Sequence, residues 1–126
     1  MKIKIHRGQN QIGGSIIEIS TDNARVFFDI GIELDEDKKI KVPQIDGLFC
    51  GKKDCDAVFI SHYHSDHIGL VDYLLPNIPV YMGNKSYKVM KSAYDYREIE
   101  TNFEPTFIED CKAIQIKDIK KSRRDI

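Results

Sequence analysis

Residues 62–67, with the sequence His-Tyr-His-Ser-Asp-His, place three imidazoles and one carboxylate within six positions. The chain contains only four histidines, so this segment holds most of them. Imidazole and carboxylate are the usual non-thiolate ligands of zinc and related divalent metals. His62 and His64 are two residues apart, so in an extended backbone their side chains point to the same side and can share one ion. Asp66 and His67 lie beyond the bend, where they can face a second ion.

The elements on either side of this segment are those that would position it. Residues 56–61 form a continuous apolar run of strand length, which is typical of a strand buried on both faces. In residues 67–75 apolar side chains recur at helical spacing, and Pro76 ends the predicted helix. Open α/β sheets bind ligands just beyond the carboxyl ends of their strands, which favours a metal site here. The alternative is a polar turn in which Ser65 or Asp66 only caps the helix.

The rest of the chain predicts a mixed α/β layered domain, because strands precede and follow strand–helix units. Alternating apolar residues and turn residues predict further strands over residues 2–5, 15–19, 25–30, 79–82, 106–108 and 113–116. Asn84 is expected to cap a helix over 84–97. The remaining segments are predicted as an exposed loop over 33–41, a short helical turn over 43–48 and a solvated basic tail over 117–126.

Length and composition limit the classes of protein. The chain has 126 residues, 19 Lys and Arg against 20 Asp and Glu, and a net charge of −1, which disfavours bulk electrostatic binding to nucleic acid. No apolar run approaches the ~20 residues that a membrane span needs, and residues 1–6 are too short and charged for a signal peptide. Three cysteines, Cys50, Cys55 and Cys111, cannot form a complete disulfide framework. We therefore expect free thiols, a cytoplasmic location and no membrane partner.

The pattern His62-x-His64-x-Asp66-His67 after an apolar strand resembles the signature of the metallo-β-lactamase superfamily. Residues 13–19, Gly-Gly-Ser-Ile-Ile-Glu-Ile, are similar to the family's first long strand. Residues 26–31, Val-Phe-Phe-Asp-Ile-Gly, are similar to its strand that ends in Asp-x-Gly. The resemblance covers residues 1–82 and implies half of a four-layer αββα sandwich, with a mixed sheet and helices on one face.

The same resemblance implies roles for particular residues. In the family, His62 and His64 would bind a first metal ion, and Asp66 and His67 a second. Asp66 is also the residue expected to be catalytic. Asp29 would lie beside the site and orient a metal ligand through a hydrogen bond. The implied cofactor is one or two divalent ions, with zinc favoured over manganese or iron.

The chain also departs from the family pattern, because family members complete the site with later histidines and a bridging aspartate. No histidine follows His67 here. Two ligands would serve each ion, one fewer than open catalytic zinc sites generally use. We therefore expect residues 1–126 to form a single truncated N-terminal half-domain that is inactive alone. A half-domain would leave one sheet face uncovered, which predicts a homodimer or larger assembly with Ile17, Ile19 or Phe27 at the contact.

The function implied is metal-assisted hydrolysis, in which divalent ions activate a water molecule. The long segment over residues 33–53 resembles the branch that includes ribonuclease J, so a phosphodiester or RNA substrate is favoured over a small ester, thioester or lactam. The alternative from a different class is a non-catalytic metal-binding or self-associating half-domain.

Overall fold

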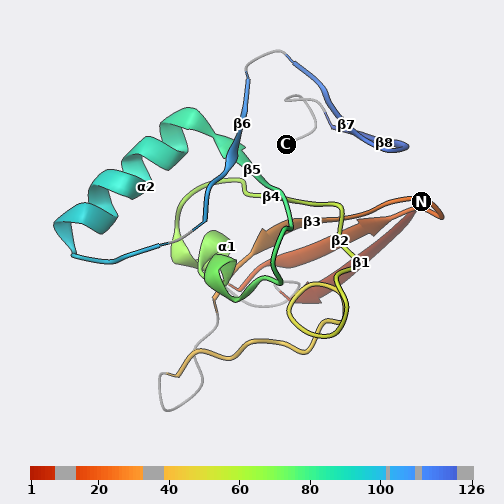
Figure 1. Ribbon diagram of the computed structural model, residues 1–126, viewed down its shortest axis with the longest axis horizontal. Coiled ribbons are helices and arrows are strands. Elements are labelled where there is room, and N and C mark those ends of the chain that lie inside the picture. Colours follow the sequence, from red (N-terminus) through yellow and green to blue (C-terminus); the bar gives the residue numbers. More distant parts are fainter. Residues whose placement is uncertain (8–13, 33–38, 102, 110–111, 122–126) are drawn as a thin grey trace.

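The computed structural model describes residues 1–7, 14–32, 39–101, 103–109 and 112–121. Within these residues, β1 to β6 form one sheet in the order of the sequence, and β7 and β8 form a separate hairpin. Strands β1, β2 and β3 pair antiparallel, whereas β3, β4, β5 and β6 pair parallel, which confirms the mixed sheet (Figure 1). The elements are β1 Lys2–Arg7, β2 Ile16–Ser20, β3 Arg25–Ile30, β4 Ala57–Phe59, α1 Ser65–Ile68, the 3-10 turn η1 Val71–Tyr73, β5 Val80–Gly83, α2 Asn84–Tyr96, β6 Thr106–Ile108, β7 Ile114–Ile116 and β8 Ile119–Lys121.

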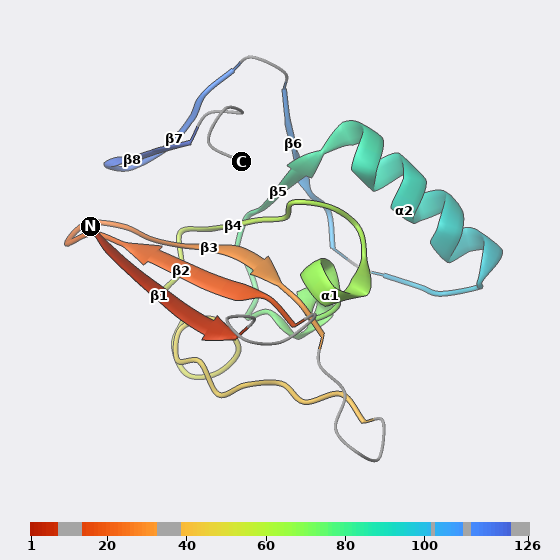
Figure 2. The same ribbon diagram turned by 180° about the vertical axis from the view of Figure 1, so that it is seen from behind.

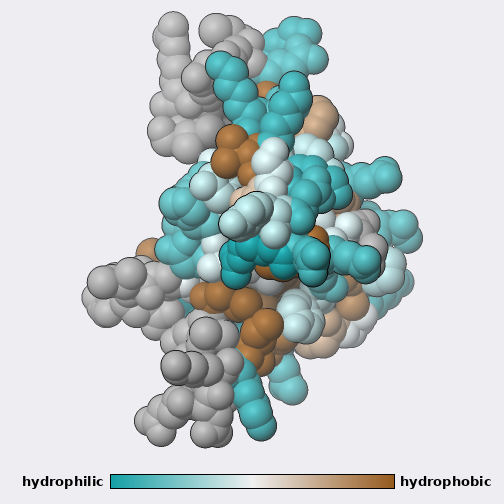
Figure 3. Space-filling model, turned by 90° about the vertical axis from the view of Figure 1, so that its left-hand side faces the viewer, coloured by the Kyte–Doolittle hydropathy of each residue, from teal (hydrophilic) through white to brown (hydrophobic). Residues whose placement is uncertain are grey.

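Both helices lie on the same face of the sheet, as predicted. Ile68 of α1 and Met90 of α2 are fully buried in one cluster with Phe27 and Val58 of the strands. Leu48, from the long connection between β3 and β4, belongs to the same cluster. Crossovers between parallel strands are nearly always right-handed, so successive crossovers in one direction bring their connections to one face. Seen from the side that carries α2, the surface is mainly hydrophilic with separate small hydrophobic patches (Figure 3).

The opposite face carries a ladder of aromatic rings. Phe28, Phe59 and Tyr81 stand in register on three neighbouring strands, with ring centroids 5.2 and 5.1 Å apart. The hairpin β7–β8 lies on this side of the sheet, away from α1 and the long connection (Figure 1, Figure 2). Its Ile119 is only 5% exposed and packs in a second cluster with Phe59. This face is therefore covered only in part.

The solvated tail predicted over residues 117–126 contains a strand, β8, and the prediction is wrong for Ile119, which is buried, whereas Lys120 is exposed as predicted. Lys117 adopts a positive φ in the hairpin turn, and its ammonium lies 3.0 Å from the Asp56 carboxylate. Asp118 accepts a hydrogen bond of 2.6 Å from Thr21, 97 residues earlier in the chain. These contacts hold the hairpin to the sheet although its sequence lacks an apolar stripe. Residues 122–126 lie outside the described part of the chain.

The predicted helix over 67–75 is wrong in its extent. Helix α1 ends at Ile68, and η1 follows as a separate turn. The Leu70 amide donates instead to the carbonyl of Ile30 at the end of β3, 3.0 Å away. That bond ties the chain to the sheet edge and interrupts the helical pattern.

Other predicted boundaries also shift. The strand expected over 56–61 comprises only Ala57–Phe59. The short helical turn predicted over 43–48 begins later, at Ile45, whose carbonyl accepts the Leu48 and Phe49 amides at 3.2 and 3.1 Å. Gly83, not Asn84, is the N-cap of α2. The expectation that Phe27 lies at an uncovered face is wrong, because it is fully buried on the helix-covered face. Strand alternation places Phe28 on the other face instead. The loop predicted over 33–41 falls largely on residues 33–38, outside the described residues.

Candidate metal centre

The histidine-rich segment begins where β4 leaves the sheet. The Ile60 amide still donates to the carbonyl of Tyr81 on β5, at 2.8 Å, so the chain stays extended to that point. His64 is the N-cap of α1, and its carbonyl accepts the amides of His67 and Ile68 at 2.9 and 3.0 Å. The single helical turn therefore carries the chain back towards the end of β3.

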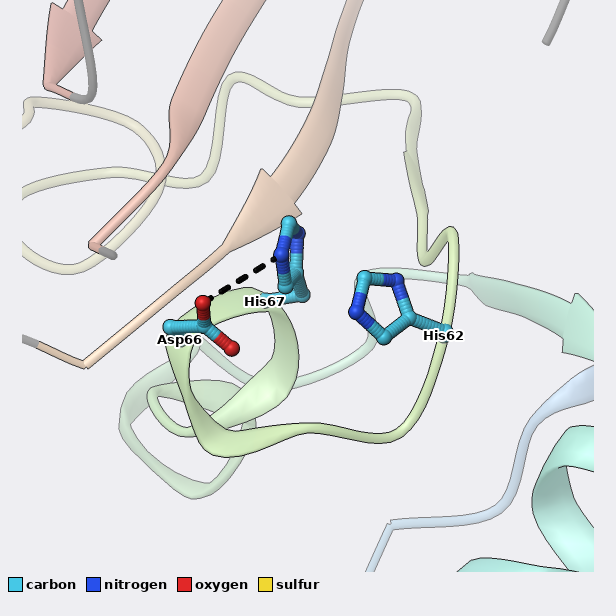
Figure 4. Close-up of side chains that lie close together, drawn as sticks. All are labelled: His62, Asp66 and His67. Atoms are coloured by element: carbon cyan, nitrogen blue, oxygen red, sulfur yellow. Dashed lines mark ion pairs between the residues drawn. The ribbon is translucent and has the colours of Figure 1, made fainter. Parts of the chain in front are cut away.

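Three of the four predicted ligands come together at this edge. One ligand atom from each of His62, Asp66 and His67 lies within 4.8 Å of the others (Figure 4). Nε2 of His67 is 3.5 Å from a carboxylate oxygen of Asp66. The exposed His64 does not belong to this group, although its ring centroid is 4.9 Å from that of His62 in an edge-on arrangement. In the described parts of the chain this is the one group of three such side chains.

Asp29 lies directly behind the group, where β3 ends. It is 8% exposed, the one buried charged residue among those described, and its φ is +61°. A positive φ is uncommon for a residue with a side chain and persists only where surrounding contacts enforce it. The Asp29 carboxylate accepts the Ser61 amide at 2.7 Å and the Ser61 hydroxyl at 2.8 Å, and it lies 2.7 Å from Nδ1 of His67. The structure thus places Asp29 against one predicted ligand, His67.

Sequence reasoning did not single out Ser61. Its hydroxyl also lies 3.0 Å from Nδ1 of His62. A serine after a strand is common, so its residue type gave no signal. Only its position between the Asp29 carboxylate and the His62 ring identifies Ser61 as part of the site.

The loop is locked to the sheet by close backbone contact. A Cβ on Gly31 would lie 1.8 Å from the Asp66 carbonyl oxygen, so only glycine fits there. The same carbonyl accepts the Ser15 amide at 3.2 Å, and the Ser65 carbonyl accepts the Ile32 amide at 2.9 Å. The loop therefore cannot shift without disturbing the ends of β2 and β3.

The electrostatic environment favours a neutral ring at His62. Burial lowers the pKa of His62, and the neighbouring His67 and His64 lower it further. Neutral imidazole is the form that binds metals.

The cysteines do not add to the site. Burial raises the pKa of the Cys55 thiol to about 12, which disfavours the thiolate form needed for coordination. Cys50 and Cys55 are free thiols as predicted, and Cys111 lies outside the described residues.

The fold and the site define a class of protein. A family model described as the metallo-beta-lactamase superfamily matches residues 11–114. The chain belongs to the metallo-β-lactamase superfamily, and membership implies chemistry based on divalent metal ions.

Within this superfamily, the chain is similar to proteins named as ribonucleases. The chain is 35% identical over 94 residues to a protein of Methanocaldococcus jannaschii named "Probable RNase MJ4", matching 72% of this chain and 21% of that protein. It is 28% identical over 127 residues to "Ribonuclease J" of Mycoplasma genitalium, matching 94% of this chain and 22% of that protein. The predicted resemblance to the ribonuclease J branch is confirmed, and the chain spans about a fifth of the length of these curated relatives.

A solved structure supports the fold. A crystal structure of a protein of unknown function from Enterococcus faecalis V583 superposes with a TM-score of 0.77 and 24% identity, covering 94% of this chain and 36% of that one. Among the described residues, neither helix has the length and apolar character needed to cross a membrane.

Proposed function

We propose that this chain carries metal-binding residues of a metal-dependent ribonuclease. The observation that carries the proposal is the grouping of His62, Asp66 and His67 at the carboxyl edge of the sheet, with Asp29 bonded to His67. Superfamily membership and relatives named as ribonucleases support it. His62 and His64 would hold one ion, and Asp66 and His67 a second.

The side chains present fit a divalent ion such as zinc, with manganese or iron as alternatives. Two imidazoles and a carboxylate are a donor set that these ions accept. A bound ion would lower the pKa of a coordinated water towards neutrality and stabilise the charge that develops on the substrate. The Asp29 carboxylate holds the His67 ring in place. Asp66, whose side chain is 40% exposed, is the proposed catalytic carboxylate because it belongs to the group and faces solvent.

The proposed substrate is a phosphodiester, RNA above all. The support is the names of the relatives, which include "Ribonuclease J" and "Probable RNase MJ4". The four candidate ligands give two per ion, fewer than the three protein ligands typical of catalytic zinc. We therefore propose weak metal binding and negligible turnover by this chain alone.

Metal binding is the first test. Zinc is titrated calorimetrically into the wild-type chain, the double variant His62→Ala/His64→Ala and the control His6→Ala. His6 is bonded to Glu18 on β2 and lies outside the group, so the control should bind as the wild type does. The double variant should lose binding, and equal heats for all three proteins would contradict the assignment.

Substrate class is the second test. RNA, a β-lactam and a thioester are each incubated with the chain, with and without added metal. Turnover is expected to be negligible with all three substrates, and any residual cleavage should be confined to RNA, require the metal and disappear in His64→Ala. Turnover of the β-lactam or thioester but not of RNA would overturn the substrate proposal and leave the metal site standing.

A further inference from the structure

We infer that Ser61 is a positioning residue that fixes the tautomer of His62 and ties it to the same carboxylate that holds His67. The Ser61 hydroxyl lies between the Asp29 carboxylate and the His62 ring. This role rests on the proposed function in one respect only, that the free nitrogen of His62 is there to bind a metal ion.

A serine hydroxyl has one hydrogen to give and can accept as well. The Ser61 hydroxyl donates that hydrogen to Oδ2 of Asp29, at 2.8 Å. Towards Nδ1 of His62, 3.0 Å away, the hydroxyl oxygen can then only accept. Nδ1 of His62 must therefore carry the proton, and Nε2 is left with its lone pair free.

The same carboxylate sets the second ring directly. Oδ2 of Asp29 lies 2.7 Å from Nδ1 of His67, and a carboxylate only accepts, so Nδ1 of His67 carries a proton too. The contact between the Ser61 hydroxyl and that nitrogen is longer, 3.5 Å. Both imidazoles therefore present Nε2 as the ligand atom. One is oriented by the carboxylate itself and the other through an intervening hydroxyl.

The anchor is held independently of both rings. The Ser61 amide donates to Oδ1 of Asp29 at 2.7 Å, which fixes the carboxylate plane. Asp29 is buried, so water competes little for its oxygens. Partners of this kind set ring orientation in metal sites, and removing one typically costs about 10–100-fold in metal affinity.

The decisive measurement needs no metal. Nitrogen-15 NMR of the imidazole rings, recorded on the metal-free protein at about pH 8, above the ordinary histidine range, reports which nitrogen carries the proton. The wild type should show His62 and His67 each with the proton on Nδ1. In Ser61→Ala, His62 should become a mixture of tautomers while His67 keeps its state. Ser61→Thr, which retains the hydroxyl, should restore the wild-type spectrum.

Ser65→Ala is the matched control, because Ser65, the first residue of α1, is exposed, and the hydrogen bonds to Asp29 come from Ser61 and His67. Its spectrum should equal the wild type. A wild-type His62 protonated on Nε2, or an unchanged His62 in Ser61→Ala, would overturn the inference. A proton on Nε2 of His62 in the wild type would overturn it even where a variant does not fold.

Zinc affinity provides the second measurement. Ser61→Ala should bind about 10–100-fold more weakly than the wild type, and Ser61→Thr and Ser65→Ala should bind as the wild type does. If no protein binds zinc, the proposed function fails while the tautomer result still stands. If zinc binds and Ser61→Ala retains full affinity, the positioning role fails and the metal site stands.

Discussion

The two faces of the sheet are built from the same strands but differ in how far their side chains are buried. We call the helix-covered face, with Phe27 and Val58, the closed face, and the opposite face, with Ile3 and Ile5, the open face. On the helix-covered face, Phe27, Val58 and Met82 are completely buried. On the opposite face, Ile3 and Ile5 of β1 are 68% and 46% exposed, and the small hairpin β7–β8 covers only part of the area. The difference arises from the crossover connections, which all reach one side of the parallel strands. The candidate metal centre lies at the edge of the closed face, so its geometry depends on that packing.

The largest expected loss of stability comes from truncating a side chain that is buried on the closed face. Met90→Ala removes a side chain with no exposed surface and should destabilise the fold by about 2–5 kcal/mol. Ile3→Ala on the open face should cost less than about 0.5 kcal/mol. Urea unfolding of the two variants measures the contrast. Similar losses would mean that the faces do not differ in the way proposed.

A smaller effect is expected where the hairpin covers the open face. Ile119→Ala should cost about 2 kcal/mol, at the low end for buried isoleucine, because a short hairpin can move to fill the space. Amide hydrogen exchange should show faster exchange in residues 114–116 and unchanged protection in β4. Unchanged exchange in the hairpin would show that Ile119 does not hold it to the sheet.

The contrast between the faces also shows what the sequence could predict. Strand alternation and the residue types of positions 62–67 are local signals, and they located the first three strands of the sheet and the histidine-rich segment. The hairpin strand β8 depends on Thr21 bonding to Asp118, and the break after α1 depends on Leu70 bonding to Ile30. Such bonds join distant parts of the chain, so no local pattern encodes them.

In the candidate site, too, some features could be predicted from local sequence and others depend on contacts in the folded chain. Residue types alone pointed to His62, Asp66 and His67, and the family resemblance added Asp29. The link through Ser61 required distances, because it depends on which atom donates to which. His64 was expected in the same set but stands outside the group of three. Its part in binding stays a prediction.

The open face also bears on association. We propose that a second copy of the chain covers the exposed isoleucines, with Ile17 and Ile19 near the contact. Light scattering should then report at least twice the 14.5 kDa chain mass at micromolar concentration. The double variant Ile3→Lys/Ile5→Lys should shift the protein towards monomer. Lys2→Gln/Lys4→Gln, on the alternate side of the same strand, is the control and should not. A monomeric wild type would show that this face needs no partner.

The smallest expected effect is a dependence on pH at the closed face. Burial alone would raise the pKa of Glu18, but hydrogen bonds from Arg25 and His6 outweigh it, so the pKa lies below its ordinary value. The Arg25 guanidinium lies 3.0 Å from the Glu18 carboxylate and 5.0 Å from the Phe27 ring, which ties this ion pair to the closed face. A carboxylate with a lowered pKa stabilises the fold above its ordinary value, about pH 4.3, and this contribution is lost as pH falls through the folded pKa. Glu18→Gln should therefore be less stable than the wild type near neutral pH, by about 1 kcal/mol, the usual net contribution of one hydrogen bond, and the gap should close in acid. Urea midpoints for both proteins across this pH range measure it, and a gap that widens in acid would reverse the assigned sign.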